Sequence, residues 1–280
     1  MAPEIPLDRL TLSATSLADD LGFVAFADLA IALKDVSTQY RIIGGHMMTG
    51  LVTRWGLGAD LYRATGDTDF GASPVVLRDL DLTVRLSGIG YIQIAGDRFE
   101  KPVTDIPTSF HPDLQVTQPN AYIDVLVPAY TSRARNNKRI GNSLVLTEAH
   151  GLADALLRPP IQLELEMHRL NGEVLRADLS FADEVSALVL KASTTQIRSK
   201  DTDIVDIWRC LEICNAAQIG PDSFLAGAPA EAADVVRALF SSREGAGIAA
   251  IASSQNLSVQ AADIRYTRIS ALVERTFGLN

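Results

Sequence analysis

The sequence predicts an α/β protein with a mixed, twisted sheet flanked by helices and a mainly helical C-terminal lobe. Three observations support this prediction. Residues 40–71 have the pattern of a strand, a glycine turn, a helix and a second strand, and residues 161–180 have the alternation of a β-hairpin. Residues 230–240 and 261–277 show the apolar spacing of amphipathic helices.

Composition and charge restrict the class of protein. The chain has 280 residues, of which 47% are hydrophobic and 21% charged, as is typical of a globular protein with a sizeable core. The net charge of -9 excludes a globally basic surface for nucleic acid but is compatible with a local basic patch. Neither a secretory signal pattern nor an apolar run of membrane length is present in the sequence. We therefore expect a cytoplasmic protein without a membrane partner.

The N-terminal part leads up to a glycine turn. Residues 1–15 are expected to form a loose lead-in, and residues 16–35 an amphipathic helix. The strand that follows stops at Gly44 and Gly45, where the backbone can adopt positive φ and approach a phosphate closely. A helix that starts there, with His46 in its first turn, would direct its free amides at an anion.

Two carboxylates follow on the next strand. Asp67 and Asp69 are separated by one residue, so their side chains project from the same face of the strand. Two like charges at this spacing repel each other, and a divalent cation such as Mg²⁺ or Mn²⁺ would relieve that repulsion. An isolated Asp-x-Asp is common at strand ends. The order of glycine turn, helix and acidic pair favours the metal-binding interpretation.

A third carboxylate lies in the run of residues 120–130. Before it, Ser73 and Pro74 have the pattern of a helix N-terminus for a helix that extends to residue 86, and residues 91–95 alternate as a strand. Asp124 then sits among apolar residues, where a carboxylate is costly unless it is paired, coordinated or solvated. It could face water on an edge strand. We favour a carboxylate that joins the acidic pair, to hold a second metal or activate an attacking hydroxyl.

A basic run comes directly after this strand. Such runs are usually solvated loops, but its position beside the predicted site makes contact with a triphosphate or an RNA backbone plausible. Its cations are Arg133, Arg135, Lys138 and Arg139.

The C-terminal half begins with a hairpin and two helices. Asn171 and Gly172 predict a tight turn in the hairpin. The helix over residues 183–198 carries Lys191, which could simply extend to the surface. Asp203 opens the next helix and could simply cap it.

Four blocks in this order resemble the AbiEii family of nucleotidyltransferase-like toxins, which includes the mycobacterial MenT toxins. The resemblance covers about residues 40–211, with His46 at the position of the serine in the superfamily signature. The blocks are Gly44-Gly45 with Asp67-x-Asp69, then Ile123-Asp124-Val125-Leu126, Lys191, and Asp203-x-x-Asp206.

The resemblance implies roles for these residues. Asp67 and Asp69 would hold the metal, and Asp124 would be a catalytic or metal-binding carboxylate. Either Asp203 or Asp206 would complete the site. The nucleotide would contact Gly44, Gly45, His46 and Lys191. The implied fold is a polymerase β-like nucleotidyltransferase core with a helical C-terminal lobe, which we place at residues 1–182 and 183–280.

The implied activity is transfer of a nucleoside monophosphate from an NTP, with Mg²⁺ or Mn²⁺, to an RNA such as the tRNA 3′ end. The protein would then be the toxin of a type IV toxin–antitoxin pair, with a cognate antitoxin as a further partner. Two alternatives stay open. One is a nucleotidyltransferase with a small, aminoglycoside-like acceptor, and the other is an inactive member that binds a nucleotide or a partner.

Overall fold

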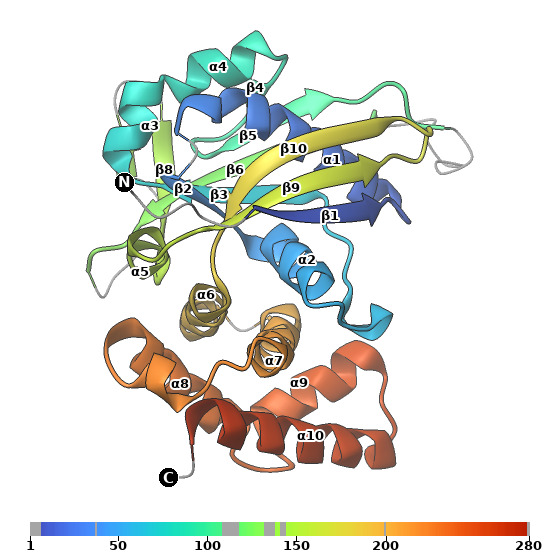
Figure 1. The fold of residues 1–280 in the computed structure, drawn as a ribbon, viewed down its shortest axis with the longest axis vertical. Coiled ribbons are helices and arrows are strands. Elements are labelled where there is room, and N and C mark those ends of the chain that lie inside the picture. The colour runs from blue at the N-terminus through green and yellow to red at the C-terminus, as the bar shows by residue number, and fades with distance from the viewer. Residues whose placement is uncertain are drawn as a thin grey trace.

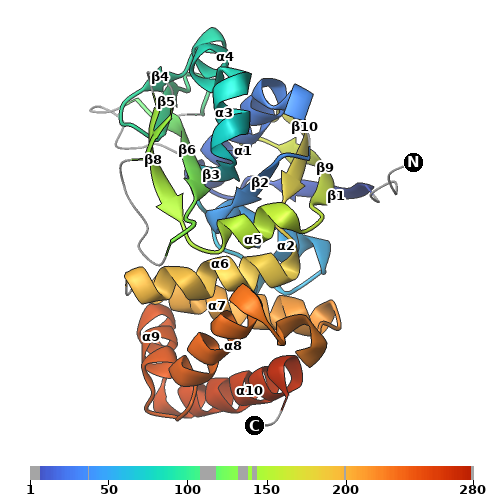
Figure 2. The same ribbon diagram turned by 90° about the vertical axis from the view of Figure 1, so that its left-hand side faces the viewer.

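The structure is a computed structural model that describes residues 7–36, 38–107, 118–131, 138–140, 144–198 and 200–278. It confirms the predicted α/β class. Figures 1 and 2 show a twisted sheet with helices packed against it, and a layer of helices below one end of the sheet.

The described strands form one mixed, ten-stranded sheet. Its main path is β1-β9-β10-β2-β3-β6-β5-β4, while β8 pairs with β6, and β7 with β8. The strands are β1 (Leu7–Ser13), β2 (Tyr40–Ile43), β3 (Asp67–Ala72), β4 (Ile92–Gln93), β5 (Arg98–Pro102), β6 (Asn120–Pro128), β7 (Lys138–Ile140), β8 (Leu144–Ala149), β9 (Ile161–His168) and β10 (Val174–Phe181).

The lead-in predicted for residues 1–15 is wrong over its second half. Strand β1 pairs in parallel with β9, from Leu7 opposite Gln162 to Ser13 opposite His168. It is an edge strand with one buried face, so its apolar signal is short and easily missed.

Helices of the core lobe pack against the sheet and are α1 (Leu17–Ala32), α2 (Gly44–Arg54), α3 (Pro74–Leu80), α4 (Leu82–Gly88) and α5 (Leu152–Leu157), with short 3₁₀ turns η1 (Lys34–Val36) and η2 (Ala59–Leu61). Ser73 caps α3 as predicted, accepting a hydrogen bond from the Val76 amide at 3.3 Å. The single helix predicted to reach residue 86 is two helices, because Asp81 adopts the left-handed conformation with φ of 50°.

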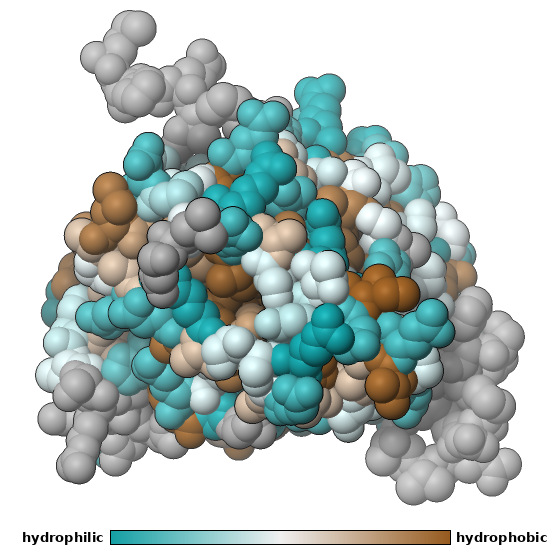
Figure 3. Space-filling model, turned by 90° about the horizontal axis from the view of Figure 1, so that it is seen from below, coloured by the Kyte–Doolittle hydropathy of each residue, from teal (hydrophilic) through white to brown (hydrophobic). Residues whose placement is uncertain are grey.

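The C-terminal helices are α6 (Glu184–Ile197), α7 (Asp201–Ala216), α8 (Gly227–Leu239), α9 (Ala246–Gln255) and α10 (Val259–Phe277), with 3₁₀ turn η4 (Pro221–Phe224) between α7 and α8. Asp183 caps α6, accepting from the Ser186 amide at 2.8 Å. Seen from below in Figure 3, apolar side chains are interspersed with polar ones. Within the described ranges, no helix combines the length and the apolar character needed to cross a bilayer.

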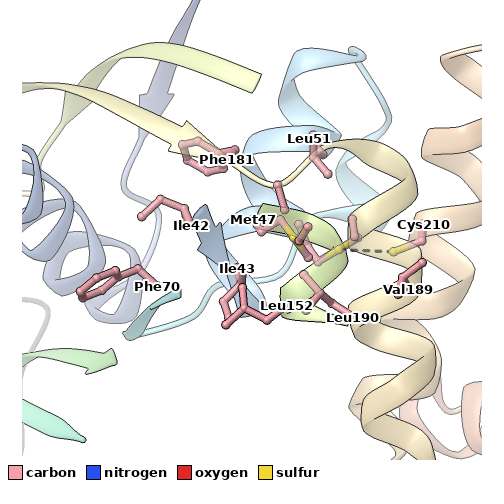
Figure 4. Packing of buried hydrophobic residues seen from close by; sticks show 14 of the residues in the cluster. Ile42, Ile43, Met47, Leu51, Phe70, Leu152, Phe181, Val189, Leu190 and Cys210 are labelled. Carbon is pink, nitrogen blue, oxygen red and sulfur yellow. Dashed lines mark hydrogen bonds between the residues drawn. The ribbon is translucent and has the colours of Figure 1, made fainter. Parts of the chain in front are cut away.

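Helix α2 joins the sheet to the C-terminal helices. Figure 4 shows Met47 and Leu51 of α2 between Phe181 at the end of β10 and the residues of α6 and α7. The sulfur of Cys210 on α7 lies 3.6 Å from that of Met48. One continuous hydrophobic core therefore includes residues on both sides of position 182, and the division into two lobes there stays a prediction.

Strands β5 and β8 both pair with β6 along the same edge, and the turn at Gly96 and Asp97 lies between them. Strand β5 pairs with the first half of β6 and β8 with the second half. Between them, the Val125 amide donates to the Asp97 carbonyl at 2.8 Å and the Val145 amide to the Gly96 carbonyl at 3.3 Å. A Cβ at Gly96 would lie 2.1 Å from the Val145 carbonyl oxygen, so this junction requires glycine.

We predict that Gly96→Ala lowers the free energy of unfolding by about 1 to 3 kcal/mol, because the clash is with backbone that no rotamer change relieves. Gly88→Ala is the matched control. Nothing lies within 4 Å of its new Cβ, at the end of α4, so that change should be neutral or gain up to about 1 kcal/mol. Urea unfolding of both variants checks this, and equal stabilities would contradict it.

Candidate active site

Strand register places two carboxylates side by side on one face of the sheet. Asp69 on β3 is the cross-strand partner of Asp124 on β6, and the two strands are parallel. The same row continues to Ile43 on β2 and to Arg98 on β5. Directly paired residues point to the same face, so the sequence-predicted carboxylates converge. Asp67 precedes Asp69 by two residues and shares this face.

Arg98 stands between two of these carboxylates. Its Nη2 atom lies 2.6 Å from Oδ2 of Asp67, and its Nε atom lies 3.1 Å from Oδ1 of Asp124. Its guanidinium carbon is also 4.9 Å from the centre of the Tyr122 ring, in a cation–π contact. The repulsion expected between the carboxylates is therefore partly neutralised by a side chain of the protein itself.

Of the three carboxylates, Asp69 is the one that makes no ion pair with Arg98. In the described part of the chain no group donates a hydrogen bond to it, and burial with the nearby Asp124 charge raises its pKa to about 7. Burial also raises the pKa of Asp124 to about 6, against the opposing effect of Arg98. Asp69 lines a cavity, so it is partly open to solvent even though protein surrounds it on most sides.

The donor set suits a hard divalent cation. Three carboxylates on one face, one of them without a hydrogen-bond donor, offer oxygen ligands and unbalanced negative charge. As the side chains stand, no cluster of three or more His, Cys, Asp or Glu residues within the described ranges is gathered around a common point that could hold a metal. Arg98 lies where Asp67 and Asp124 would otherwise share a cation.

A cavity of about 910 Å³ lies between this sheet face and helix α6. Its apolar side chains come from both sides, from Ile43, Leu126 and Val145 on the sheet and from Leu190 and Ile197 on α6. The charged side chains that line it are the acids Asp69, Asp97, Glu148 and Asp203 and the cations Lys191 and Arg198, with His150 at the end of β8. Acids outnumber cations, so an anionic ligand would need additional positive charge.

Lys191 is held at the cavity by a buried carboxylate. Its Nζ atom lies 2.7 Å from Oδ2 of Asp206, which also contacts Arg209 at 2.6 Å and Arg63 at 3.5 Å. These cations hold the pKa of Asp206 below its ordinary value despite the burial. Only 8% of Lys191 is exposed, so it does not extend to the surface.

The aspartates of the last block have different positions. Asp203 lines the cavity and accepts from Arg198 at 2.9 Å. Asp206 lies behind Lys191 and is not among the cavity-lining residues. The geometry therefore gives Asp203 a place facing a ligand and Asp206 a place that positions Lys191.

The glycine turn is required by the carboxylate beside it. Gly44 begins α2 with φ of 72°, and a Cβ there would lie 1.9 Å from Oδ2 of Asp69. Gly44 lines the cavity, whereas a Cβ at Gly45 would contact Thr65. His46 points away from the cavity, with its ring 4.6 Å from that of Phe26, and burial lowers its pKa to about 4.

The basic run lies partly outside the described residues, which include neither Arg133 nor Arg135. Lys138 and Arg139 form part of β7. The Lys138 ammonium lies 3.4 Å from the Glu148 carboxylate, at the side of the cavity. The proposed RNA or phosphate contact of this run stays a prediction.

Sequence reasoning missed one side of the site. No role was predicted for Arg98, because its register with Asp124 involves two segments that are separated in the chain. Residues Thr147 and Glu148 line the cavity from β8. The short apolar run Leu144-Val145-Leu146 was a usable signal for that strand.

Comparisons with known proteins add a distant structural likeness. No protein-family model matches the sequence, and no curated protein sequence matches it significantly. A crystal structure of an antigenic nucleotidyltransferase-like protein from Paracoccidioides brasiliensis is similar over 95% of this chain and 97% of its own, with a TM-score of 0.46 and 14% identity. We therefore infer the function from the geometry of the site.

The raised pKa of Asp69 predicts a pH-dependent stability. The folded protein binds this proton more tightly than the unfolded chain, so the stabilisation is fully present below the ordinary pKa of 3.8 and is lost as pH rises to about 7. Asp69→Asn should remove this dependence. At pH values above that window the variant should exceed the native protein by on the order of 1 to 3 kcal/mol.

Urea unfolding with a chelator present, across this pH range, measures the difference between native protein and variant. Asp178→Asn is the control, since Asp178 is an exposed strand aspartate on β10. A difference between native protein and Asp69→Asn that stays flat with pH would contradict the assigned burial.

The two aspartates of the last block should respond differently to removal of charge. Asp206→Asn leaves two buried cations without their partner, so we expect a loss of about 3 to 5 kcal/mol in unfolding free energy. Asp203 pairs with a half-exposed Arg198, so Asp203→Asn should lower the unfolding free energy by about 1 kcal/mol or less. Denaturant unfolding decides, and equal losses would contradict the distinction.

Proposed function

We propose that this protein is a divalent-metal-dependent nucleotidyltransferase. The observation that carries the proposal is the register of Asp69 with Asp124, because it places that carboxylate beside Asp69, which lines a cavity that Lys191 and Arg198 also line. Carboxylates on the sheet and two cations on the facing helix suit a triphosphate that arrives with metal ions.

The metal would be held by Asp67, Asp69 and Asp124, where it supplies charge neutralisation and polarises the phosphate under attack. Lys191 and Arg198 would contact phosphate oxygens, with Lys191 fixed by Asp206. The amide-rich start of α2 at Gly44 would face the same anion. The base would lie against the apolar side chains of α6, Leu190 and Ile197.

The transfer step would join an acceptor hydroxyl to the α-phosphorus. The hydroxyl oxygen forms the new bond, the bond from the α-phosphorus to its bridging oxygen breaks, and pyrophosphate leaves. Asp124 would take the hydroxyl proton in its alternative role as the base, in which Asp67 and Asp69 hold the metal. The rest of the site positions these groups and balances their charge.

The proposed acceptor is RNA, specifically the tRNA 3′ end, as the resemblance to the AbiEii toxins implies. In that role the protein would be the toxin of a type IV pair, with an antitoxin as its partner. The surplus of acids in the cavity favours a second candidate, a small cationic acceptor of the aminoglycoside kind.

A transfer assay tests this function. Each of the four NTPs, labelled at the α-phosphate, is incubated with Mg²⁺ and total tRNA, and separately with an aminoglycoside. We expect label in tRNA with at least one NTP, none when the label is on the γ-phosphate, and none on tRNA whose 3′ end has been oxidised. Asp69→Asn should lower the rate about a hundredfold or more.

The exposed Asp178→Asn serves again as control and should retain the native rate. Label in the aminoglycoside alone would overturn the RNA acceptor and support the second candidate. If the protein binds nucleotide but no acceptor is labelled, the proposed transferase activity is wrong and the protein is a nucleotide-binding protein.

A further inference from the structure

Arg98 is fixed to the carboxylates by strand register. It is the first residue of β5 and the cross-strand partner of Asp124, so its side chain rises from the same face of the sheet. From there its guanidinium reaches across β6 to Asp67 on β3, at 2.6 Å. One cation of the protein thus binds two of the three proposed metal ligands.

Arg98 also has a support that does not depend on those carboxylates. Its guanidinium lies over Tyr122, which precedes Asp124 by two residues on the same face of β6. The side chain is 34% exposed, whereas that of Lys191 is 9% exposed and held by Asp206. Arg98 can therefore turn away from Asp67 without unpacking the core, and Lys191 cannot.

We propose that Arg98 is an internal counter-ion that competes with a divalent cation for Asp67 and Asp124 and moves to the nucleotide phosphates when metal and nucleotide bind together. This inference rests on the proposed function, since it assumes that metal site. A guanidinium that leaves two carboxylates needs another anion, and a triphosphate supplies one. Metal would consequently bind the free protein weakly and the nucleotide complex well.

Two affinities measured on the full chain test the proposal. The first is the affinity for Mn²⁺ without nucleotide, followed by calorimetry. The second is the affinity, at saturating Mn²⁺, for an NTP analogue with a methylene group in place of the α–β bridging oxygen, which cannot be transferred. Neither readout requires activity.

We expect opposite changes in Arg98→Gln. It should bind Mn²⁺ about tenfold or more tightly than the native protein, since a competing cation beside the carboxylates is gone. It should bind the analogue about tenfold more weakly, since a phosphate contact is gone. Both affinities of Arg98→Lys should lie between those of the native protein and Arg98→Gln, because lysine keeps the charge but not the bidentate geometry of the guanidinium.

The control is Arg85→Gln. Arg85 has a similar exposed fraction, 32%, and pairs with Asp35 at 2.8 Å away from the cavity, so both affinities should stay native. A structural role for Arg98 would weaken both affinities together, which would overturn the proposal. If Arg98→Gln does not fold, the same opposite changes in Arg98→Lys decide.

The outcomes separate this inference from the proposed function. Equal Mn²⁺ affinity in native protein and Arg98→Gln, with Mn²⁺ bound by both and lost in Asp69→Asn, would overturn the counter-ion role and leave the metal site standing. Failure of every folded variant to bind Mn²⁺ would overturn the metal site and the counter-ion role together.

Discussion

The site depends on the repulsion between two carboxylates, Asp69 and Asp124, which lie opposite each other on neighbouring parallel strands. Asp69 and Asp124 in register would destabilise a sheet if nothing balanced them. The protein balances them incompletely. Arg98 pairs with Asp124, while Asp69 has no hydrogen-bond donor in the described part of the chain and its pKa rises to about 7. Lys191 and Arg198 offset the Asp69 charge only in part, and this incomplete balance is the physical basis of the proposed activity.

The remaining charges are arranged by burial. Burial of the Lys191 ammonium alone would cost free energy, and the ion pair with Asp206 at 2.7 Å offsets that cost. Asp206 in turn is balanced by Arg209 from the same helix. Helix α6 can thus present a fixed ammonium to the cavity, while Arg98 on β5 is more exposed, at 34% of its side chain. Lys191 is thus held by a carboxylate behind it, whereas Arg98 is held by the carboxylates of the sheet itself.

Much of this site was predictable because it follows from local rules. Alternation put Asp67 and Asp69 on one face, and the glycine pair predicted the turn into α2. The pairing that brings Asp124 to Asp69 involves segments more than fifty residues apart, and one strand's sequence does not specify its partner or register. Arg98 was missed for the same reason. The N-terminal strand β1 was missed because an edge strand with a short apolar face resembles a loop.

The reason for Gly44 shows how local and distant constraints combine. From the sequence, a glycine there allows the backbone to approach a phosphate. In the structure, the group that approaches it is the Asp69 carboxylate, which a Cβ at Gly44 would displace. Both statements lead to one requirement, because the proposed triphosphate over this turn and the proposed metal on Asp69 would share the same small volume. Gly44 therefore serves the carboxylate and the proposed nucleotide at once. A side chain at this position would disturb Asp69 even before any ligand bound.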